Sequence, residues 1–201
     1  MKTQIITLFT ALVLVAGVAN TSQAATTAKD QNYTVLTDVS AINKIEVRGN
    51  VELYVSDGPA DQVKVYNNYY AESALVKSRN GVLSIASYKA EKLVVWVTAA
   101  DLRSVSAYDN AEVKSFGDLS KIEFDVDLHN NATAKLTLNA FSANVTVNDY
   151  AKVDLDGKAD QLNLKHSITS IVNANDFAAV NYTDTKTGMP VPAKEDEFAG
   201  L

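Results

Sequence analysis

The residues best suited to chemistry form a tyrosine cluster in the first half of the chain. Tyr66, Tyr69 and Tyr70 surround Asn67 and Asn68, and Trp96 follows later in the sequence. Aromatic faces suit the C–H groups of sugars, and amides offer hydrogen bonds, so the cluster is a candidate carbohydrate platform. Ordinary strand packing, with the tryptophan in the core, is the simpler interpretation, and we favour it.

Two further tyrosines lie in segments rich in Asn and Asp. Tyr108 precedes Asp109-Asn110, and Tyr150 follows Asn148-Asp149. Such segments form tight turns at the surface. The two tyrosines are therefore the remaining candidates for ligand contact, on a ridge of turns.

Pairs of acids occur at Asp125 and Asp127 and at Asp154 and Asp156. A spacing of two puts each pair on one face of a strand. Polysaccharide hydrolases use paired carboxylates, and lyases of β-helical shape also need calcium. The apolar residue inside each pair should point inward, which leaves the acids in solvent. We predict no catalytic residue, and a small β-helix polysaccharide lyase or hydrolase remains the second alternative.

Metal and thiol chemistry have little support in the sequence. The chain has no cysteine, which excludes disulfides, thiolate nucleophiles and zinc–thiolate sites. Its two histidines, His129 and His166, fall at neighbouring turn positions two repeats apart, roughly 10 Å in a stacked β structure. We expect both at solvated corners, and we predict neither a metal site nor a cofactor.

The elements that position these residues come from a repeated phrase. It alternates apolar and polar residues, passes through three polar or turn-forming residues, and then alternates again. Four copies, at 105–113, 126–134, 145–153 and 162–170, begin 21, 19 and 17 residues apart, and 45–55 is a fifth copy. A period near 20 with internal alternation predicts a stacked β array.

Aligning the copies predicts columns of like residues inside the array. The column after each turn holds Ala111, Ala132, Ala151 and Ile168, and a later column holds Ser115, Leu136, Leu155 and Val172. Stacked strands place the members of a column about 4.8 Å apart. Asn and Asp before the small residues tolerate the left-handed backbone of a sharp corner.

Residues 62–97 depart from the repeat. A strand is predicted at 63–66, and Asn80-Gly81 predicts a type I′ hairpin. The continuous apolar run 93–97 predicts a strand buried on both faces. We interpret this region as a small β-meander that leads into four to five coils of a β-solenoid.

Composition and the first residues indicate the compartment. The chain has 201 residues, 47% of them hydrophobic, and a net charge of −6. This size suits one domain, and the acidic balance argues against nucleic acid and anionic membranes as partners. Lys2, an apolar run over 5–19 and Ser22-Gln23-Ala24 are typical of a signal peptide. No later segment is apolar enough to span a membrane.

Several phrases together resemble the putative auto-transporter adhesin family with the head GIN domain. They are Ile45 to Leu53, Asn80 to Ile85, Val95 to Thr98 and Leu102 to Val105. The resemblance implies an all-β, right-handed β-helix-like domain exported in Gram-negative bacteria, and it supplies no catalytic residues. The family often has glycine-rich corners where this chain has Asn and Asp.

The expected organisation is a signal peptide at 1–24, a lead-in at 25–41, one β-solenoid domain at 42–184 and a flexible tail at 185–201. The predicted function is a non-enzymatic adhesin or surface-interaction module at the periplasm or cell surface. Its expected partners are envelope or extracellular polysaccharides or proteins. A carbohydrate-binding module that uses Tyr66, Tyr69, Tyr70, Tyr108 or Tyr150 is the first alternative.

Overall fold

The computed structural model describes residues 33–36, 39, 41–66 and 74–188, and within them it contains strands and no helix. The predicted signal peptide, most of the lead-in and residues 189–201 lie outside this part. The all-β prediction is confirmed. The strands are β1 (Thr34–Leu36), β2 (Lys44–Gly49), β3 (Val51–Asp57), β4 (Gln62–Tyr66), β5 (Ala74–Arg79), β6 (Val82–Ser87), β7 (Leu93–Ala99), β8 (Ser104–Tyr108), β9 (Glu112–Ser115), β10 (Leu119–Leu128), β11 (Thr133–Val147), β12 (Lys152–Ser167) and β13 (Ile171–Thr187).

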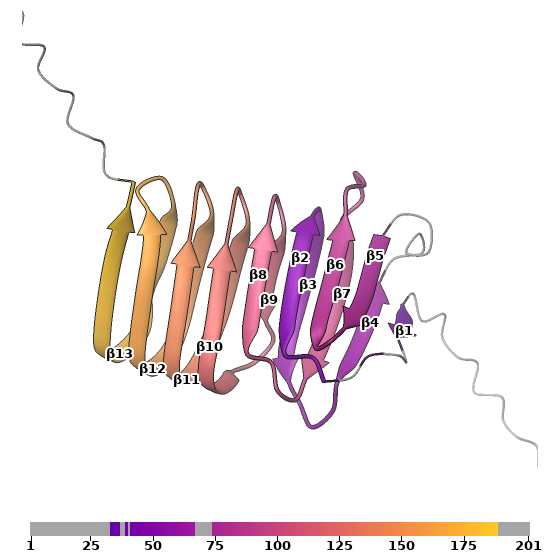
Figure 1. Cartoon of the computed structure of the whole chain (residues 1–201), viewed down its shortest axis with the longest axis horizontal. Coiled ribbons are helices and arrows are strands. Elements are labelled where there is room, and N and C mark those ends of the chain that lie inside the picture. Colours follow the sequence, from indigo (N-terminus) through magenta and orange to yellow (C-terminus); the bar gives the residue numbers. More distant parts are fainter. Residues whose placement is uncertain (1–32, 37–38, 40, 67–73, 189–201) are drawn as a thin grey trace, which may run out of the picture. The chain divides into compact units, whose positions relative to one another are not determined.

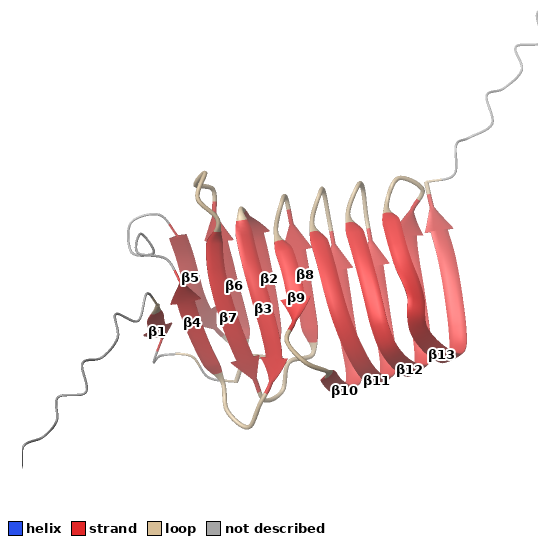
Figure 2. Ribbon diagram, turned by 180° about the vertical axis from the view of Figure 1, so that it is seen from behind, coloured by secondary structure: helices blue, strands red, loops and turns tan. Residues whose placement is uncertain are grey.

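All thirteen strands belong to one sheet that curls around its own core (Figure 1). The back row is β4-β7-β3-β9, and the front row is β5-β6-β2-β8-β10. The long strands β11, β12 and β13 pass through both rows. The first residues of β11 pair with β9, and its later residues pair with β10. Figure 2 shows the same curl from behind, with the long strands bending at its lower edge.

Alternating side chains build the core between the two rows. In β7, Leu93, Val95 and Val97 are buried, whereas Val94 and Trp96 are half-buried on the outer face. The prediction that this run is buried on both faces is therefore wrong. The inward side chains form one continuous apolar cluster from Ile42 to Leu164, so the period-2 pattern accounts for most of the interior.

The predicted columns are in register for the first three long copies. Val105 pairs with Val126, and Val126 pairs with Val145. Ala111, Ala132 and Ala151 are all fully buried where the chain turns between the rows. These turns leave too little interior space for a larger side chain, which is why alanine recurs.

The fourth copy was placed two residues too early. Val145 pairs with Leu164, not Leu162, so the fourth copy aligns with the third two residues later than predicted. Ser170, not Ile168, therefore follows Ala151 in its column, and Ile168 is exposed at the corner. Val172 likewise pairs with Val153 rather than joining the column of Leu155. His166 pairs with Val147 in an inward column, so its prediction as a solvated corner is wrong.

The corners contain the predicted left-handed residues. Asp109, Asn130 and Asp149 have φ values of 61°, 59° and 54°. Each corner is also tied to the next, because the Asp109 amide donates to Asn130 Oδ1 at 3.2 Å and the Asn130 amide donates to Asp149 Oδ2 at 2.9 Å. A short polar side chain thus both permits the backbone conformation and links adjacent layers.

The predicted β-meander does not precede the array. Strands β6 and β7 form a layer that lies in parallel against β2 and β3, and β8 and β9 lie on the other side of β2 and β3. The first layer in sequence is therefore enclosed by the next two. Only β1, β4 and β5 pair antiparallel with their neighbours, and Leu36 of β1 packs against one end of the core. The hairpin at Asn80-Gly81 is confirmed, because both residues have positive φ and join β5 to β6.

Candidate functional site

Five aromatic side chains gather on the outer face of the back row, and we call this set the aromatic face. Two of them come from the paired positions Tyr54 on β3 and Trp96 on β7. Tyr66 lies at the end of β4, which pairs antiparallel with β7, and Tyr33 and Phe116 lie just outside β1 and β9. Alternation places them outward because their neighbours Leu53, Val65 and Val95 point into the core.

The rings form a connected surface around the tryptophan. Tyr54 and Trp96 stack with centroids 4.6 Å apart and planes 20° apart. Phe116 contacts the same indole at 5.1 Å, and Tyr66 lies 6.4 Å from it. Tyr33 then contacts Tyr66 at 4.9 Å. Phe116 is 62% exposed and the other four rings are half-buried, so the surface is supported from below and open to solvent.

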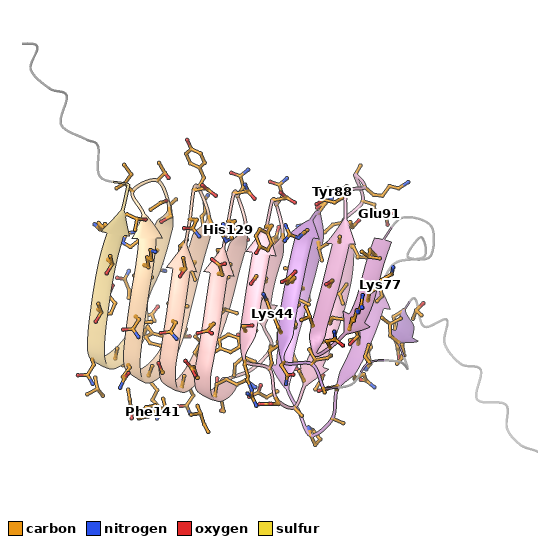
Figure 3. All side chains as sticks on the ribbon, in the orientation of Figure 1. Lys44, Lys77, Tyr88, Glu91, His129 and Phe141 are labelled. Carbon is orange, nitrogen blue, oxygen red and sulfur yellow. The ribbon has the colours of Figure 1, made fainter. Side chains whose placement is uncertain are left out.

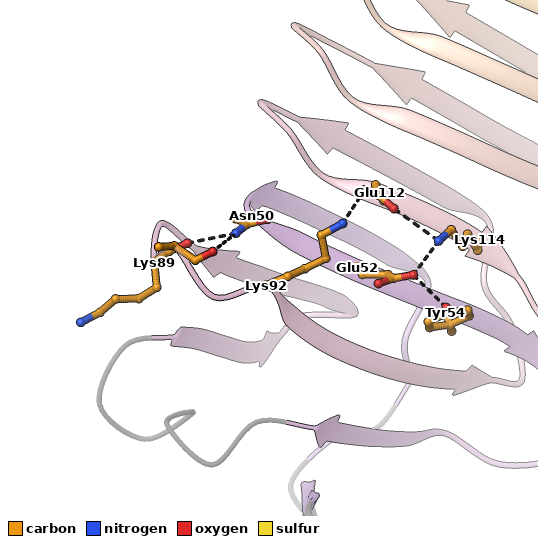
Figure 4. A network of polar contacts seen from close by, with 8 residues as sticks. Asn50, Glu52, Tyr54, Lys89, Lys92, Glu112 and Lys114 are labelled. Carbon is orange, nitrogen blue, oxygen red and sulfur yellow. Dashed lines mark hydrogen bonds and ion pairs between the residues drawn. The ribbon is translucent and has the colours of Figure 1, made fainter.

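Charged groups border the aromatic face. Lys114 Nζ lies 2.5 Å from Glu52 Oε1 and 3.3 Å from Glu112 Oε2, and Lys92 lies 2.5 Å from Glu112. The Tyr54 hydroxyl donates to Glu52 at 2.8 Å (Figure 4). This network joins β3 to β9 and to the residue before β7. It fixes the orientation of one ring of the aromatic face.

The network shifts the titration of its members. Hydrogen bonds from Lys114 and then from Tyr54 hold the pKa of Glu52 below its usual range. The same pair raises the pKa of Lys114, and the hydrogen bond to Glu52 raises the pKa of the Tyr54 phenol. At neutral pH the border therefore carries fixed, opposite charges and a protonated tyrosine that is already engaged as a donor.

This arrangement suits binding rather than bond cleavage. Half-exposed rings held on a sheet offer π surface at low entropic cost, and the bordering carboxylates and ammonium groups can hydrogen-bond polar substituents. A polysaccharide segment, with its alternating C–H patches and hydroxyls, has matching chemistry.

The sequence predicted only part of the aromatic face. Tyr66 and Trp96 meet as the carbohydrate hypothesis supposed, and the favoured placement of the tryptophan in the core is wrong. Tyr69, Tyr70, Asn67 and Asn68 lie outside the described residues. Sequence reasoning missed three members, which are Tyr33, Tyr54 and Phe116. The alternation of β3 indicates that Tyr54 points outward, but its pairing with Trp96 on β7 is not evident from the sequence.

The two tyrosines predicted on the corner ridge are placed differently from each other. Tyr108 is covered on both faces, because Arg48 lies 3.8 Å over its ring and His129 stacks on it at 4.8 Å. Tyr150 is 65% exposed two corners further along the chain. Tyr88 is also exposed at a corner (Figure 3), and its hydroxyl donates a hydrogen bond to Asp109 at 3.2 Å. The ridge thus offers separate side chains and no continuous ring surface.

Three of the four paired acids and both histidines make polar contacts with neighbouring side chains. Asp125 accepts a hydrogen bond from Asn144, and Asp154 accepts one from Asn173. Asp127 contacts His129 at 2.9 Å, and the second histidine, His166, lies 3.1 Å from Asp184. In the part of the chain that the structure describes, no three His, Asp or Glu side chains converge on a possible metal position.

Comparison with known proteins places the chain in a family. The model of the family described as "Putative auto-transporter adhesin, head GIN domain" matches residues 41–189. The chain belongs to this family. No curated protein sequence matches it. Over the described ranges, the structure has no helix with the length and apolarity needed to cross a bilayer.

Solved structures share the fold at low sequence identity. A putative adhesin from Bacteroides fragilis is 16% identical, with a TM-score of 0.69 over 79% of this chain and 78% of the other. A putative adhesin from Parabacteroides distasonis is 17% identical, with a TM-score of 0.59 over 79% and 80% of the two chains. A third, from Parabacteroides merdae, is 16% identical, with a TM-score of 0.55 over 79% of each. At these identities the likeness concerns the fold.

Proposed function

We propose that the protein is a non-enzymatic adhesion module of the Gram-negative cell envelope that binds polysaccharide through its aromatic face. Membership of an adhesin family supports the general role. The predicted signal peptide supports export, to the periplasm or the cell surface. Of the paired acids that a lyase or hydrolase would need, Asp125, Asp127 and Asp154 accept hydrogen bonds from asparagines of neighbouring layers, which favours binding over catalysis.

The observation that carries the proposal is the aromatic face itself. Exposed aromatic surface costs solvation free energy, and an isolated sheet face does not need five contacting rings to remain folded. Stacking of sugar rings on Trp96 and Phe116 would remove this apolar surface from water. The Glu52–Lys114 border would then select ligands with hydroxyl or amide groups at the edge of the stacked ring.

The layers serve this role as coils of a right-handed β-solenoid. Parallel, in-register pairing from β8 through β13 supports the coiled description, and the family resemblance supports the handedness. A solenoid presents flat, rigid faces, and rigid faces lose little entropy on binding an extended polymer. An experimental structure would test the hand directly.

The single tryptophan of the chain makes the binding proposal easy to test, because Trp96 lies at the centre of the aromatic face. We expect a glycan array to identify a bound polysaccharide and titration with it to change the Trp96 fluorescence. Phe116→Ala should then raise the dissociation constant about tenfold, the loss expected for one stacking ring of about 1.4 kcal/mol. The free energy of unfolding should change little, because Phe116 is exposed.

Phe141→Ala is the matched control. Phe141 is a phenylalanine of similar exposure, at 54%, and it lies at the bend of β11 (Figure 3). The control should leave both the fluorescence change and the affinity as in the native protein. Equal losses of affinity in Phe116→Ala and Phe141→Ala would show that the polysaccharide does not bind at the aromatic face. Binding that leaves the Trp96 fluorescence unaltered would show the same. Polysaccharide turnover would contradict the non-enzymatic role.

A further inference from the structure

The two ends of the curled sheet are built differently. At one end the antiparallel strands β1 and β5 border a smaller cavity of about 470 Å³, and Lys77 and Arg79 place charges on β5. Short strands and charges protect a sheet edge from further pairing. At the other end β13 pairs with β12 on one side, and no strand among the described residues pairs with its other side. This exposed edge is 17 residues long.

The core is also open beside β13. The two arms of β13 are residues 171–179, before its bend, and 181–187, after it. A cavity of about 680 Å³ lies between them, and its walls combine apolar with polar side chains: Leu164, Val172, Phe177 and Tyr182 with His166, Asp184 and Lys186. The apolar members continue the columns of the interior, yet Tyr182 is 54% exposed. Exposed apolar side chains next to a long unpaired strand edge are features that natural sheets ordinarily avoid.

We propose that β13 pairs with β13 of a second copy of this chain, so that two open ends close each other around a two-fold axis. A two-fold axis through the bend of β13 exchanges the front and back rows. It therefore places the first arm of one β13 beside the second arm of the other, running in opposite directions. The result is an antiparallel ladder and a core shared by both copies.

The side-chain pattern of β13 selects one register. Phe177 and Ala179 on the first arm line the cavity, as do Tyr182 and Asp184 on the second arm. In an antiparallel pair, side chains directly opposite each other lie on the same face of the sheet. The cavity-lining residues of the two copies therefore face each other when Ala179 lies opposite the partner's Tyr182, with the axis passing between residues 180 and 181. The partner's Asp184 then lies opposite Phe177.

No like charges face each other in this register. Lys186 lies opposite the partner's Asn175, and Asp176 lies opposite the partner's Thr185. Val180, at the bend, lies beside the axis. A head-to-tail stack is disfavoured by comparison, because the other end offers short antiparallel strands and the charges of β5 instead of a long free edge.

The area is sufficient for a stable dimer. The paired stretch runs from Ala174 to Thr187, which spans about 46 Å at about 3.3 Å per residue. With a strip about 10 Å wide and the end of the core added, each copy buries on the order of 700 Å². The total of about 1,400 Å² lies within the range of specific interfaces.

Sedimentation of the native protein tests the proposal. We expect a monomer–dimer equilibrium, and we expect Val180→Asp to raise the dissociation constant at least about tenfold by bringing two carboxylates together at the axis. The variant should fold, because Val180 is 79% exposed and Asp160 occupies the matching bend position on β12. Ile122→Asp is the control, because Ile122 is 83% exposed at the same bend on β10, away from the edge.

A second measurement checks the geometry. Because the chain has no cysteine, a nitroxide can be attached at Val180→Cys or at Ile122→Cys alone. The backbones at Val180 should lie about 5 Å apart in the dimer and those at Ile122 about 34 Å apart, counting strands at about 4.8 Å each. Strong dipolar broadening is therefore expected only for the first. A protein that stays monomeric at all concentrations, as when its own residues 189–201 cover the edge, overturns the proposal. So does a dimer that Val180→Asp leaves intact.

Discussion

Individual backbone positions limit which residues this sheet accepts, and Gly157 is the sharpest case. It has a φ of +106° on β12, and a Cβ added there would lie 2.1 Å from the carbonyl oxygen of Leu138 on the adjacent strand. Gly157→Ala should lower the free energy of unfolding by about 3 kcal/mol or more, the sum of left-handed strain and a backbone clash. Urea denaturation monitored by circular dichroism measures the loss.

Gly117 separates the two causes. It also has a positive φ, of +79°, but nothing lies within 4 Å of an added Cβ. Gly117→Ala should therefore cost only about 1 kcal/mol, from strain alone. Equal losses of unfolding free energy in Gly157→Ala and Gly117→Ala would mean that the backbone near Leu138 moves aside without cost.

Sequence reasoning succeeded at the corner residues and failed at Gly157 for a physical reason. Asp109, Asn130 and Asp149 recur at a fixed place in the repeat, and their residue types are those that adopt left-handed backbone. Gly157 occurs once, close to a register shift between Asp154 and Asp156 that depends on the next strand. A single irregularity has no repeat to reveal it.

Between elements, the Glu52–Lys114 pair joins β3 to β9 and makes stability depend on pH. The pKa of Glu52 is lower in the folded protein than its ordinary value, so the stabilisation is present above that ordinary value. It is lost as the pH falls through the folded-state pKa. Glu52→Gln should therefore destabilise the protein near neutral pH and reduce the loss of stability on acidification.

Denaturation at a series of pH values between neutrality and strong acid measures this dependence. Glu91→Gln is the control, because Glu91 is exposed after β6 (Figure 3) and has no ion pair among the described residues. It should reproduce the native pH profile. If Glu52→Gln lost stability on acidification as steeply as the native protein, the ion pair between Lys114 and Glu112 would be sufficient without Glu52.

The errors in element placement come from the symmetry of alternation. Leu162, Leu164 and His166 alternate with polar residues, so a shift of two residues keeps every side chain on its face. The first three long copies were aligned correctly because an alanine follows each of their corners, but Ser170 holds that position in the fourth. Strand existence followed from the local pattern, whereas the exact register needed a distinctive residue.

At the scale of the whole molecule, the order of strands was not accessible from the sequence. The repeat implies that layers stack, but not that β2 and β3 lie between β6-β7 and β8-β9. The aromatic face depends on this order, because Tyr54, Trp96 and Phe116 come from separate segments. Long-range pairing thus decides the candidate site, and local propensity does not encode it.

The same strand order predicts a gradient of local stability. Strands β2 and β3 have paired neighbours on both sides, and those neighbours come from later parts of the chain, so they open only when several layers separate. In contrast, β13 has one paired neighbour and half-exposed inward side chains. In dilute solution, amide hydrogen exchange should be faster in β13 than in the other long strands, β10 to β12, and slowest in β2 and β3. Higher protein concentration should slow exchange in β13 alone, since only this edge gains hydrogen-bond partners in the dimer. Uniform exchange along the chain would mean that the layers unfold together and that the free edge is no weaker than the centre.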